Sequence, residues 1–235
     1  MTIDNDYSGG FKYAVDIVFC IDVTGSMDPV IDAVKENVRS FHTLLLASMA
    51  EKGKSISQLR VRVIAYRDFA DKPSNALEAT DFLKLPDQQS QFEAFVQRLH
   101  AIDGGDEPES GLEALSVAID SAWERGLDRR RHVIALFTDA SAHPLGDTRS
   151  RGAANYPQSA PATIDELFER WGYGSSQSAA MENSAKRLLL FAPDTMPWNV
   201  IAADWNNAIF LPSKAGDGLE EVEMQEIIDA IANSI

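Results

Sequence analysis

The stretch AVDIVFCIDVTGSMDP, residues 14 to 29, decides which fold this chain adopts. It begins with a strand pattern in which Val15, Ile17, Phe19 and Ile21 point one way and Ala14, Val18 and Cys20 point the other. A strand that is apolar on both faces is predicted to lie in the centre of a parallel sheet, between two layers of helices. Asp28 and Pro29 then supply an N-cap and a first helical residue, which predicts a helix that runs to about Ala50.

The rest of the chain continues this alternation of strands and helices. Strands are expected at 59–66, 132–138, 187–192 and 208–211, with a short edge strand near 76–83, and helices are expected to begin near residues 90, 112, 163, 198 and 220. The sequence therefore predicts an α/β fold of the Rossmann-like, doubly wound kind, with a mainly parallel central sheet flanked by helices on both faces. The length of 235 residues favours one domain over 14–235, after a tail at 1–13 and with an insertion at about 141–186.

Composition and charge narrow the classes of partner. The formal net charge of −15 opposes unaided binding to nucleic-acid phosphates and to anionic membranes. The first ten residues are polar and acidic, unlike a signal peptide, and no apolar run approaches the roughly 20 residues of a membrane span. A lone cysteine, Cys20, lies in an apolar run and suits a reducing compartment, so we expect a buried thiol and a cytoplasmic protein.

Oxygen-bearing side chains follow three of the predicted elements. Asp22, Thr24 and Ser26 lie at the end of the first strand, Asp106 lies in the loop before the helix near residue 112, and Asp139 follows the strand 132–138. In an open parallel sheet, ligands bind beyond the carboxyl ends of the strands. Three carboxylates gathered there would repel one another without a cation, and hard oxygen donors select Mg²⁺, or Mn²⁺ or Ca²⁺, over zinc and copper. These five residues are the predicted metal ligands.

Simpler interpretations of the same residues remain open. Asp106 could serve only as a helix N-cap, with Glu109 at the third helical position. Thr24 and Ser26 could be ordinary turn residues, and Asp139 could cap a loop.

Three further side chains near this edge have two interpretations each. His143 is expected to be a solvated loop histidine, with a contact to the site as the alternative. Arg67 and Asp68 end the second strand, and they are expected to form a surface ion pair rather than to contribute to the site.

Three motifs in this order resemble a known family. Residues 22–26 (DVTGS) match the Asp-x-Ser/Thr-x-Ser signature of the metal-ion-dependent adhesion site in von Willebrand factor A domains. Residues 137–139 (FTD) are similar to the element that ends the family's fourth strand, and 104–109 (GGDEPE) to its glycine-rich loop. The resemblance covers about residues 15–211, and it departs from many members in having Asp106 where they have threonine.

The resemblance implies a way of binding the metal and a class of function. The two hydroxyls would bind the metal directly, the acidic residues directly or through water, and a partner's carboxylate would often fill the open position. The family is mostly a binding scaffold, and bacterial members often work beside AAA-class ATPases or kinase and phosphatase systems.

We therefore expect a metal-dependent protein-interaction module of a larger intracellular assembly rather than an enzyme. One alternative is a metal-assisted hydrolase, but a phosphatase of the haloacid-dehalogenase type would need Asp-x-Asp where this chain has Thr24. The other alternative is a structural domain with a vestigial site.

Overall fold

A seven-stranded sheet forms the centre of the computed structural model, which describes residues 11–71, 74–102, 108–126, 129–173, 179–217, 219 and 222–235. The strands are β1 (Phe11–Asp22), β2 (Lys54–Tyr66), β3 (Leu77–Ala79), β4 (Leu83–Leu85), β5 (Arg130–Phe137), β6 (Lys186–Pro193) and β7 (Ala208–Ser213). Their order is β3-β2-β1-β5-β6-β7, and β4 also pairs with β2. Only β3 and β4 run antiparallel to their neighbour, so the predicted mainly parallel sheet is confirmed.

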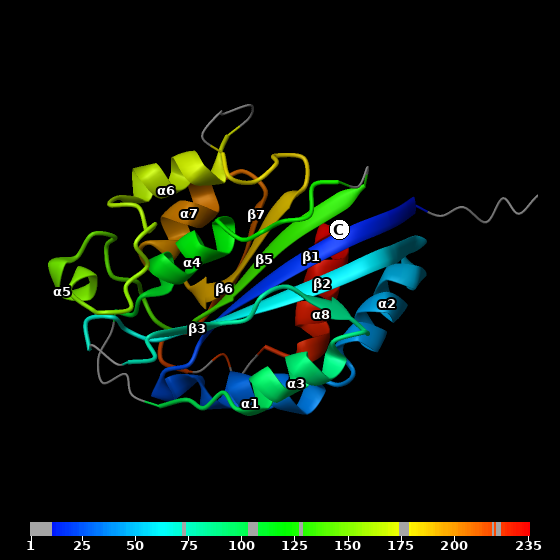
Figure 1. Cartoon of the computed structure of the whole chain (residues 1–235), viewed down its shortest axis with the longest axis horizontal. Helices are drawn as coiled ribbons and strands as arrows, with labels where there is room; N and C mark the ends of the chain where they lie inside the picture. The colour runs from blue at the N-terminus through cyan, green and yellow to red at the C-terminus, as the bar shows by residue number, and fades with distance from the viewer. Residues whose placement is uncertain are drawn as a thin grey trace, which may run out of the picture.

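Helices cover both faces of this sheet (Figure 1). One face carries α1 (Asp28–Asn37), α2 (Phe41–Glu51), α3 (Gln89–Gln97) and α8 (Met224–Ser234). The other carries α4 (Gly111–Ile119), α6 (Ile164–Trp171) and α7 (Trp198–Asp204), while the short α5 (Thr148–Arg151) lies at the margin. Among the described residues, no helix is long and apolar enough to cross a bilayer.

The two faces of β1 pack against these two layers as the alternation predicts. Val15 and Ile17 belong to the core under α1, α2, α3 and α8, whereas Val18 and Cys20 belong to the core under α4, α6 and α7. Cys20 has no exposed surface, and burial raises the pKa of its thiol to about 12, so it stays protonated and unreactive.

The helix predicted from Asp28 to about Ala50 is interrupted, because two side chains compete for its backbone hydrogen bonds. The Asn37 amide donates to the carbonyl of Ala33, and the Ser40 hydroxyl donates to the carbonyl of Asn37. The chain turns at 38–40 and starts again as α2 at Phe41. Two helices therefore connect β1 to β2 where one was predicted.

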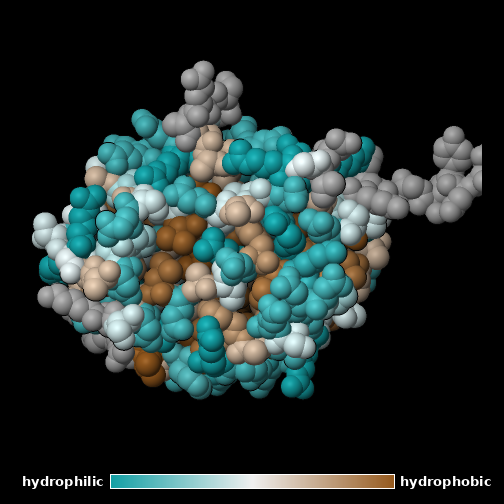
Figure 2. Space-filling model, in the orientation of Figure 1, coloured by the Kyte–Doolittle hydropathy of each residue, from teal (hydrophilic) through white to brown (hydrophobic). Residues whose placement is uncertain are grey.

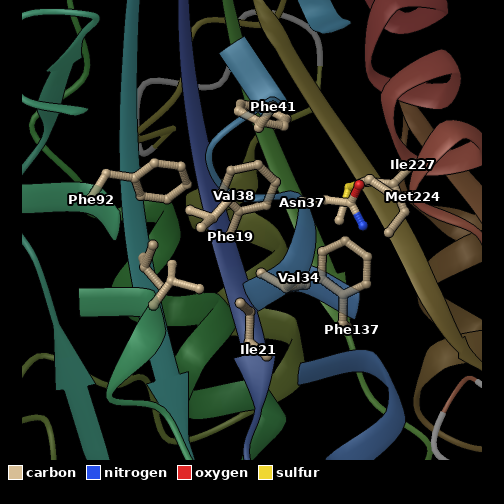
Figure 3. A pocket seen from close by; sticks show the side chains of 12 residues that line it. Phe19, Ile21, Val34, Asn37, Val38, Phe41, Phe92, Phe137, Met224 and Ile227 are labelled. Carbon is tan, nitrogen blue, oxygen red and sulfur yellow. The ribbon is translucent and has the colours of Figure 1, made fainter. Parts of the chain in front are cut away.

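A small cavity lies in the core between the sheet and the first helical layer (Figure 3). It measures about 30 Å³. The side chains around it come from β1, β2, β5, α1, α2, α3 and α8, and they include Phe19, Val34, Phe41, Phe92, Phe137 and Ile227.

On the opposite layer, Figure 2 shows hydrophobic side chains gathered over α4. A groove of about 400 Å³ opens there, between α4, the residues after β5 and the loop before α7; its lining includes Leu112, Leu145, Ile164 and Met196.

The segment 141–186 is ordered against this layer wherever it is described. Thr163 caps α6 by accepting a hydrogen bond from the Glu166 amide at 3.2 Å, which confirms the helix start predicted near residue 163. At the end of the segment, the fully buried Lys186 ammonium donates to the carbonyls of Trp171 and Gly172 and lies 4.6 Å from the centre of the Trp171 ring. These contacts satisfy carbonyl groups at the C-terminus of α6.

The strand order gives the sheet a topological switch point at β1. The chain passes from β1 to β2 on one side, and later strands β5, β6 and β7 follow on the other side. The direction of winding therefore reverses at β1, and in such sheets the ligand site lies beyond the carboxyl ends of the strands at that point. Asp22 ends β1, and Asp139 lies two residues after the end of β5.

Candidate metal centre

The turn after β1 is organised around the carboxylate of Asp22. Its Oδ1 atom accepts hydrogen bonds from the Thr24 amide at 3.0 Å and the Thr24 hydroxyl at 2.6 Å. Its Oδ2 atom accepts one from the Thr138 hydroxyl at 2.8 Å. Asp22, Thr24 and Thr138 are all buried, so this carboxylate joins the end of β1 to the end of β5.

Ser26 reaches the same place from the exposed side of the turn. Residues Gly25–Met27 form a single 3-10 turn, η1, which the Met27 amide closes by donating to the carbonyl of Thr24. The turn leaves Ser26 exposed, and its hydroxyl donates to Oδ1 of Asp139 at 3.0 Å. The backbone carbonyl of Asp139 accepts a hydrogen bond from the Gly216 amide at 2.9 Å, which fixes the main chain of this aspartate.

Burial and like charge both act on Asp22. The pKa of the Asp22 carboxyl is raised to about 6 overall. Desolvation is the largest cause, the hydrogen bonds from Thr24 and Thr138 act against it, and the negative charge of Asp139 adds to it. A buried carboxylate that faces a second carboxylate is costly unless a positive charge lies nearby. The electrostatics of this turn therefore favour a bound cation.

The donor atoms present fit a hard divalent cation. Asp22, Thr24, Ser26 and Asp139 bring two carboxylates and two hydroxyls to the ends of two adjacent strands. The fifth predicted ligand, Asp106, lies outside the described residues. Within the described ranges, no group of three or more His, Cys, Asp or Glu side chains is placed to hold a metal by itself. A cation held at this turn would therefore need the hydroxyls of Thr24 and Ser26 as well as the carboxylates.

Glu109 is a functional candidate that the sequence interpretation missed. The sequence places Glu109 in the glycine-rich loop 104–109 or, in the alternative, at the third position of a helix; in the structure α4 starts at Gly111 and the Glu109 side chain is 4% exposed. Burial, followed by the charges of Asp22, Asp68, Asp71 and Asp139, raises the pKa of its carboxyl to about 9. A glutamate one helical turn before an apolar run is a common helix-start pattern, so the local sequence carried no signal for this burial.

His143 and Asp68 are not the solvated histidine and surface aspartate that were predicted. Both are buried, and His143 Nε2 lies 3.1 Å from Oδ2 of Asp68. The other oxygen of Asp68 accepts from the Ser110 hydroxyl at 3.0 Å. The residues that follow β5 pack over the end of β2, and this removes both side chains from water.

Asp68, His143 and Ser110 are not arranged as the catalytic residues of a serine hydrolase. In a nucleophilic serine site, the imidazole accepts the proton of the serine hydroxyl. Here Asp68 lies between the other two side chains, and Ser110 donates to the carboxylate instead of to His143.

Arg67 is likewise buried instead of lying on the surface. Its guanidinium donates to the carbonyls of Asn75 and His100, each at 3.1 Å, and lies 3.8 Å from the Glu78 carboxylate. It holds the loop after β2 in place and takes no part in the proposed ligand set.

Glu113 fastens the segment 141–160 to α4 from a fully buried position. The Tyr156 hydroxyl donates to Oε1 of Glu113 at 3.1 Å, and Oε2 has no hydrogen-bond partner in the structure. Burial raises the pKa of Glu113 to about 7 from a usual value near 4.5; the bond from Tyr156 lowers it, and the charges of Asp68 and Asp147 raise it further.

Glu113→Gln should remove a pH-dependent loss of stability. A carboxyl whose pKa is raised on folding contributes its full stability below the unfolded pKa and loses it as pH rises through the folded pKa. In the metal-free chain we therefore expect the variant to match wild type near pH 4.5 and to exceed its free energy of unfolding at pH 8 by about 2 kcal/mol. Urea unfolding at both pH values measures this, with the exposed Glu36→Gln as control. A difference between Glu113→Gln and wild type that does not change with pH would contradict the expectation.

Comparison with known proteins agrees with this architecture. A family model described as von Willebrand factor A domain matches residues 16–149, more than half of the 235-residue chain. The protein named alpha-protein kinase vwkA of Dictyostelium discoideum is 28% identical over 156 residues, which are 66% of this chain and 23% of that protein. This chain thus spans about a quarter of the length of that relative.

The comparison with solved structures found two pilus proteins. The pilus adhesin SpaC of Lactobacillus rhamnosus GG, in its open conformation, is 14% identical with a TM-score of 0.49, over 94% of this chain and 30% of that chain. The vWF domain of the type V pili tip protein Mfa5 of Porphyromonas gingivalis is 19% identical with a TM-score of 0.37, over 57% of this chain and 42% of that chain. The matched family model covers β1 from Asp16 onward, the turn built on Asp22 and the end of β5 with Asp139, and the chain belongs to the von Willebrand factor A domain family.

Proposed function

We propose that this chain is a protein-interaction domain that depends on a divalent cation held by Asp22, Thr24, Ser26, Asp106 and Asp139. One observation carries the proposal: the hydrogen bonds of Asp22 and Asp139 bring both hydroxyls of the turn to the ends of β1 and β5. Two of these bonds, from Ser26 to Asp139 and from Thr138 to Asp22, join residues more than 110 positions apart in the sequence. A turn with only a local structural role would not need such bonds.

The proposed cation is Mg²⁺, with Mn²⁺ or Ca²⁺ as alternatives, because every donor is a hard oxygen. When bound, it would offer a position for an oxygen atom of the partner. The chain's own residues prepare that position: Asp22 orients the Thr24 hydroxyl, and Asp139 orients the Ser26 hydroxyl, which is the most exposed of these groups. Gly25 and Ser26 are the exposed residues of this turn, so a protein surface would reach the site from their side.

The proposal also covers the bounds of the domain, its cellular compartment and its class of partner. We propose that residues 14–235 form one domain with an insertion at 141–186, that it acts in the cytoplasm as a scaffold or regulatory component, and that its partner is a protein. AAA-class ATPases and kinase or phosphatase systems are the partner classes considered. The kinase name of the Dictyostelium relative supports the second class.

Thr24→Ala and Ser26→Ala should each weaken Mg²⁺ and Mn²⁺ binding about tenfold or more while leaving the fold intact, because each removes one donor oxygen from an otherwise unchanged turn. Calorimetric titration of each metal into each variant measures the effect, and circular dichroism checks the fold. Ser90→Ala, which removes an exposed hydroxyl on α3, is the matched control and should bind like wild type. Wild-type affinity in both site variants would refute this ligand set.

Partner capture tests the function itself. A pull-down from the native host is run with Mg²⁺ and again with EDTA, using wild type and Ser26→Ala as baits. We expect a partner that is lost in EDTA and is also lost with the variant. Equal capture under all conditions would leave the fold as a scaffold whose binding does not use the metal.

A further inference from the structure

The groove beside α4 is formed by four separate segments of the chain. They are α4 itself, the residues after β5, the start of α6 and the residues before α7, and they contribute Leu112, Leu145, Ile164 and Met196 among others. The volume of about 400 Å³ lies within the roughly 300–1,000 Å³ of clefts that hold ligands in proteins. Figure 2 shows hydrophobic side chains gathered on this side of the molecule. The groove is therefore large enough to receive side chains of a partner.

Two packing contacts hold the walls of this groove in place. Gly146 has a φ of +83°, and a Cβ atom there would lie 2.7 Å from the carbonyl oxygen of Ala162, so the turn after Leu145 packs directly on the segment before α6. Trp198 is fully buried at the start of α7, and its indole Nε1 donates to the carbonyl of Ala140 at 2.9 Å. Because the walls are fixed without a partner, binding would require little further ordering of this chain.

The lining of the groove is apolar, and one of its side chains is largely exposed. Met196 is 70% exposed, the largest fraction for a large hydrophobic side chain in the part of the chain that the structure describes. Thr163 also lines the groove, but its hydroxyl already accepts from the Glu166 amide to cap α6. Contiguous exposed apolar surface marks binding sites, and methionine is enriched at interfaces because its side chain adapts to a partner. The groove thus favours an apolar contact.

The exposed charged residues beside the lining residues are acidic on two of its walls. Asp165 and Glu166 follow Ile164 in α6, and all three belong to the first turn of that helix or lie just after it. Asp194 comes shortly before Met196 on the segment that leads into α7. Asp165, Glu166 and Asp194 are each exposed, so their charges act on anything that enters the groove.

Arg149, which lies shortly after Leu145, does not reverse the sign of this surface. Its Nη2 atom lies 2.9 Å from Oδ2 of Asp147, so the two charges of this ion pair offset each other. The excess charge around the groove stays negative. A partner that carries lysine or arginine beside its apolar side chains would match both the lining and the charge.

Charge also argues against two other occupants of the groove. A second copy of this chain would bring a formal net charge of −15 toward an acidic surface. The first ten residues of the chain include Asp4 and Asp6 and contain no lysine or arginine, so they lack the basic side chains that the surface favours. A basic segment of another protein is the occupant that remains.

We propose that the groove beside α4 binds a segment of a partner protein in which one or two large apolar side chains are flanked by lysine or arginine. The apolar side chains fill the space between α4, α6 and Met196, and the basic side chains pair with Asp165, Glu166 and Asp194. This inference goes beyond the proposed metal-dependent function, because neither the apolar lining nor the acidic residues beside it require a cation.

A random library of short peptides, selected on the immobilised full chain in EDTA, supplies the probes. We expect the enriched peptides to carry Leu, Ile, Met or Phe next to Lys or Arg. Fluorescence anisotropy then measures the affinity of each enriched peptide for wild type and for the variants. Circular dichroism checks that each variant is folded.

Met196→Lys tests the apolar contact. The exposed position of Met196 tolerates a polar side chain, but a lysine there repels a basic peptide and removes the apolar surface, so binding should weaken at least about tenfold. Met196→Leu should stay within about twofold of wild type because it keeps the apolar volume. Tyr173→Lys adds the same charge at a 67% exposed side chain that does not line the groove, and it should bind like wild type.

The double variant with Asp165→Asn and Asp194→Asn tests the charge. We expect it to bind the enriched peptides roughly three- to tenfold more weakly at low salt, and the difference should shrink at high salt. The control is the double variant with Glu36→Gln and Glu51→Gln, which removes the same charge from exposed positions on α1 and α2, over the other face of the sheet. It should stay within about twofold of wild type.

The outcomes decide the inference without reference to the metal site. Failure to enrich any peptide, enrichment of acidic or uncharged peptides, or equal affinity for wild type and Met196→Lys would overturn it. Equal losses in Met196→Lys and Tyr173→Lys would also overturn it, because the effect would then come from added positive charge anywhere on the surface. Since every measurement is made in EDTA, each of these results would leave the metal-dependent function standing.

Discussion

Asp22→Asn should abolish divalent-cation binding without lowering the stability of the metal-free chain. Asp22 has no exposed surface, and its two oxygens accept three hydrogen bonds from Thr24 and Thr138. Asparagine has nearly the same shape, so the turn can form, but the negative charge that attracts the cation is gone. Removing a buried charge also relieves its desolvation and its repulsion from Asp139.

Asp22→Asn should remove the stabilisation by Mg²⁺ but should not lower the stability of the metal-free chain. This combination distinguishes a lost metal ligand from general damage to the fold. Wild type should gain about 2.7 kcal/mol of stability when Mg²⁺ reaches a hundred times its dissociation constant, and the variant should gain none. We expect the affinity to fall by more than about 100-fold, beyond the loss caused by outer-shell partners. Thermal unfolding across a Mg²⁺ series, with an EDTA baseline, measures both effects.

Asp28→Asn is the control for this substitution. Asp28 belongs to the same acidic stretch and starts α1, but its side chain is exposed and it is not among the proposed ligands. Its variant should keep the stabilisation by Mg²⁺. If Asp22→Asn were stabilised by Mg²⁺ as strongly as wild type, the assignment of the cation to this turn would be wrong.

Asp16→Ala should cost about 3 kcal/mol of unfolding free energy, because it breaks an ion pair whose carboxylate is buried in the middle of β1. The Asp16 side chain is 2% exposed. Its Oδ1 atom accepts from Arg60 Nε at 2.7 Å, and its Oδ2 atom accepts from Arg60 Nη2 and, at 2.7 Å, from the Glu124 amide. Alanine leaves the guanidinium without its carboxylate and the Glu124 amide without an acceptor. Urea unfolding of the metal-free chain measures the loss.

The more exposed ion pair between Glu182 and Arg130 serves as a control for the cost of losing Asp16. Glu182 pairs with Arg130, but its side chain is 42% exposed. Glu182→Ala should therefore cost less than about 1 kcal/mol. The double variant with Asp16→Ala and Arg60→Ala should lose less than the sum of its single variants, since it leaves no buried charge without a partner. Equal costs for Asp16→Ala and Glu182→Ala would show that burial of the Asp16–Arg60 pair does not matter.

The central strand and the candidate ligands at its end follow from local sequence. Apolar residues on both faces of β1 predict a strand covered on both sides, and the structure divides Ile17 and Val18 between the two cores as expected. A parallel sheet brings the carboxyl ends of neighbouring strands to one edge, so the proximity of Ser26 and Asp139 was predictable without coordinates. Side-chain alternation and strand direction are properties of short segments, and a sequence expresses both.

Burial of the charged residues around that edge was decided by tertiary structure alone. Asp68, Glu109 and His143 each lie in a loop, where no periodic pattern reports which way a side chain points. Their local sequences match a strand end, a helix start and a polar loop, all of which are usually solvated. They are buried because β2, β1 and β5 are adjacent in the sheet, so that the residues after β5 pack over the loops after β2 and before α4. Contacts between segments this far apart in the sequence, such as Asp68 with His143 and Glu109 with Ala142, depend on strand order and loop packing, and local sequence encodes neither.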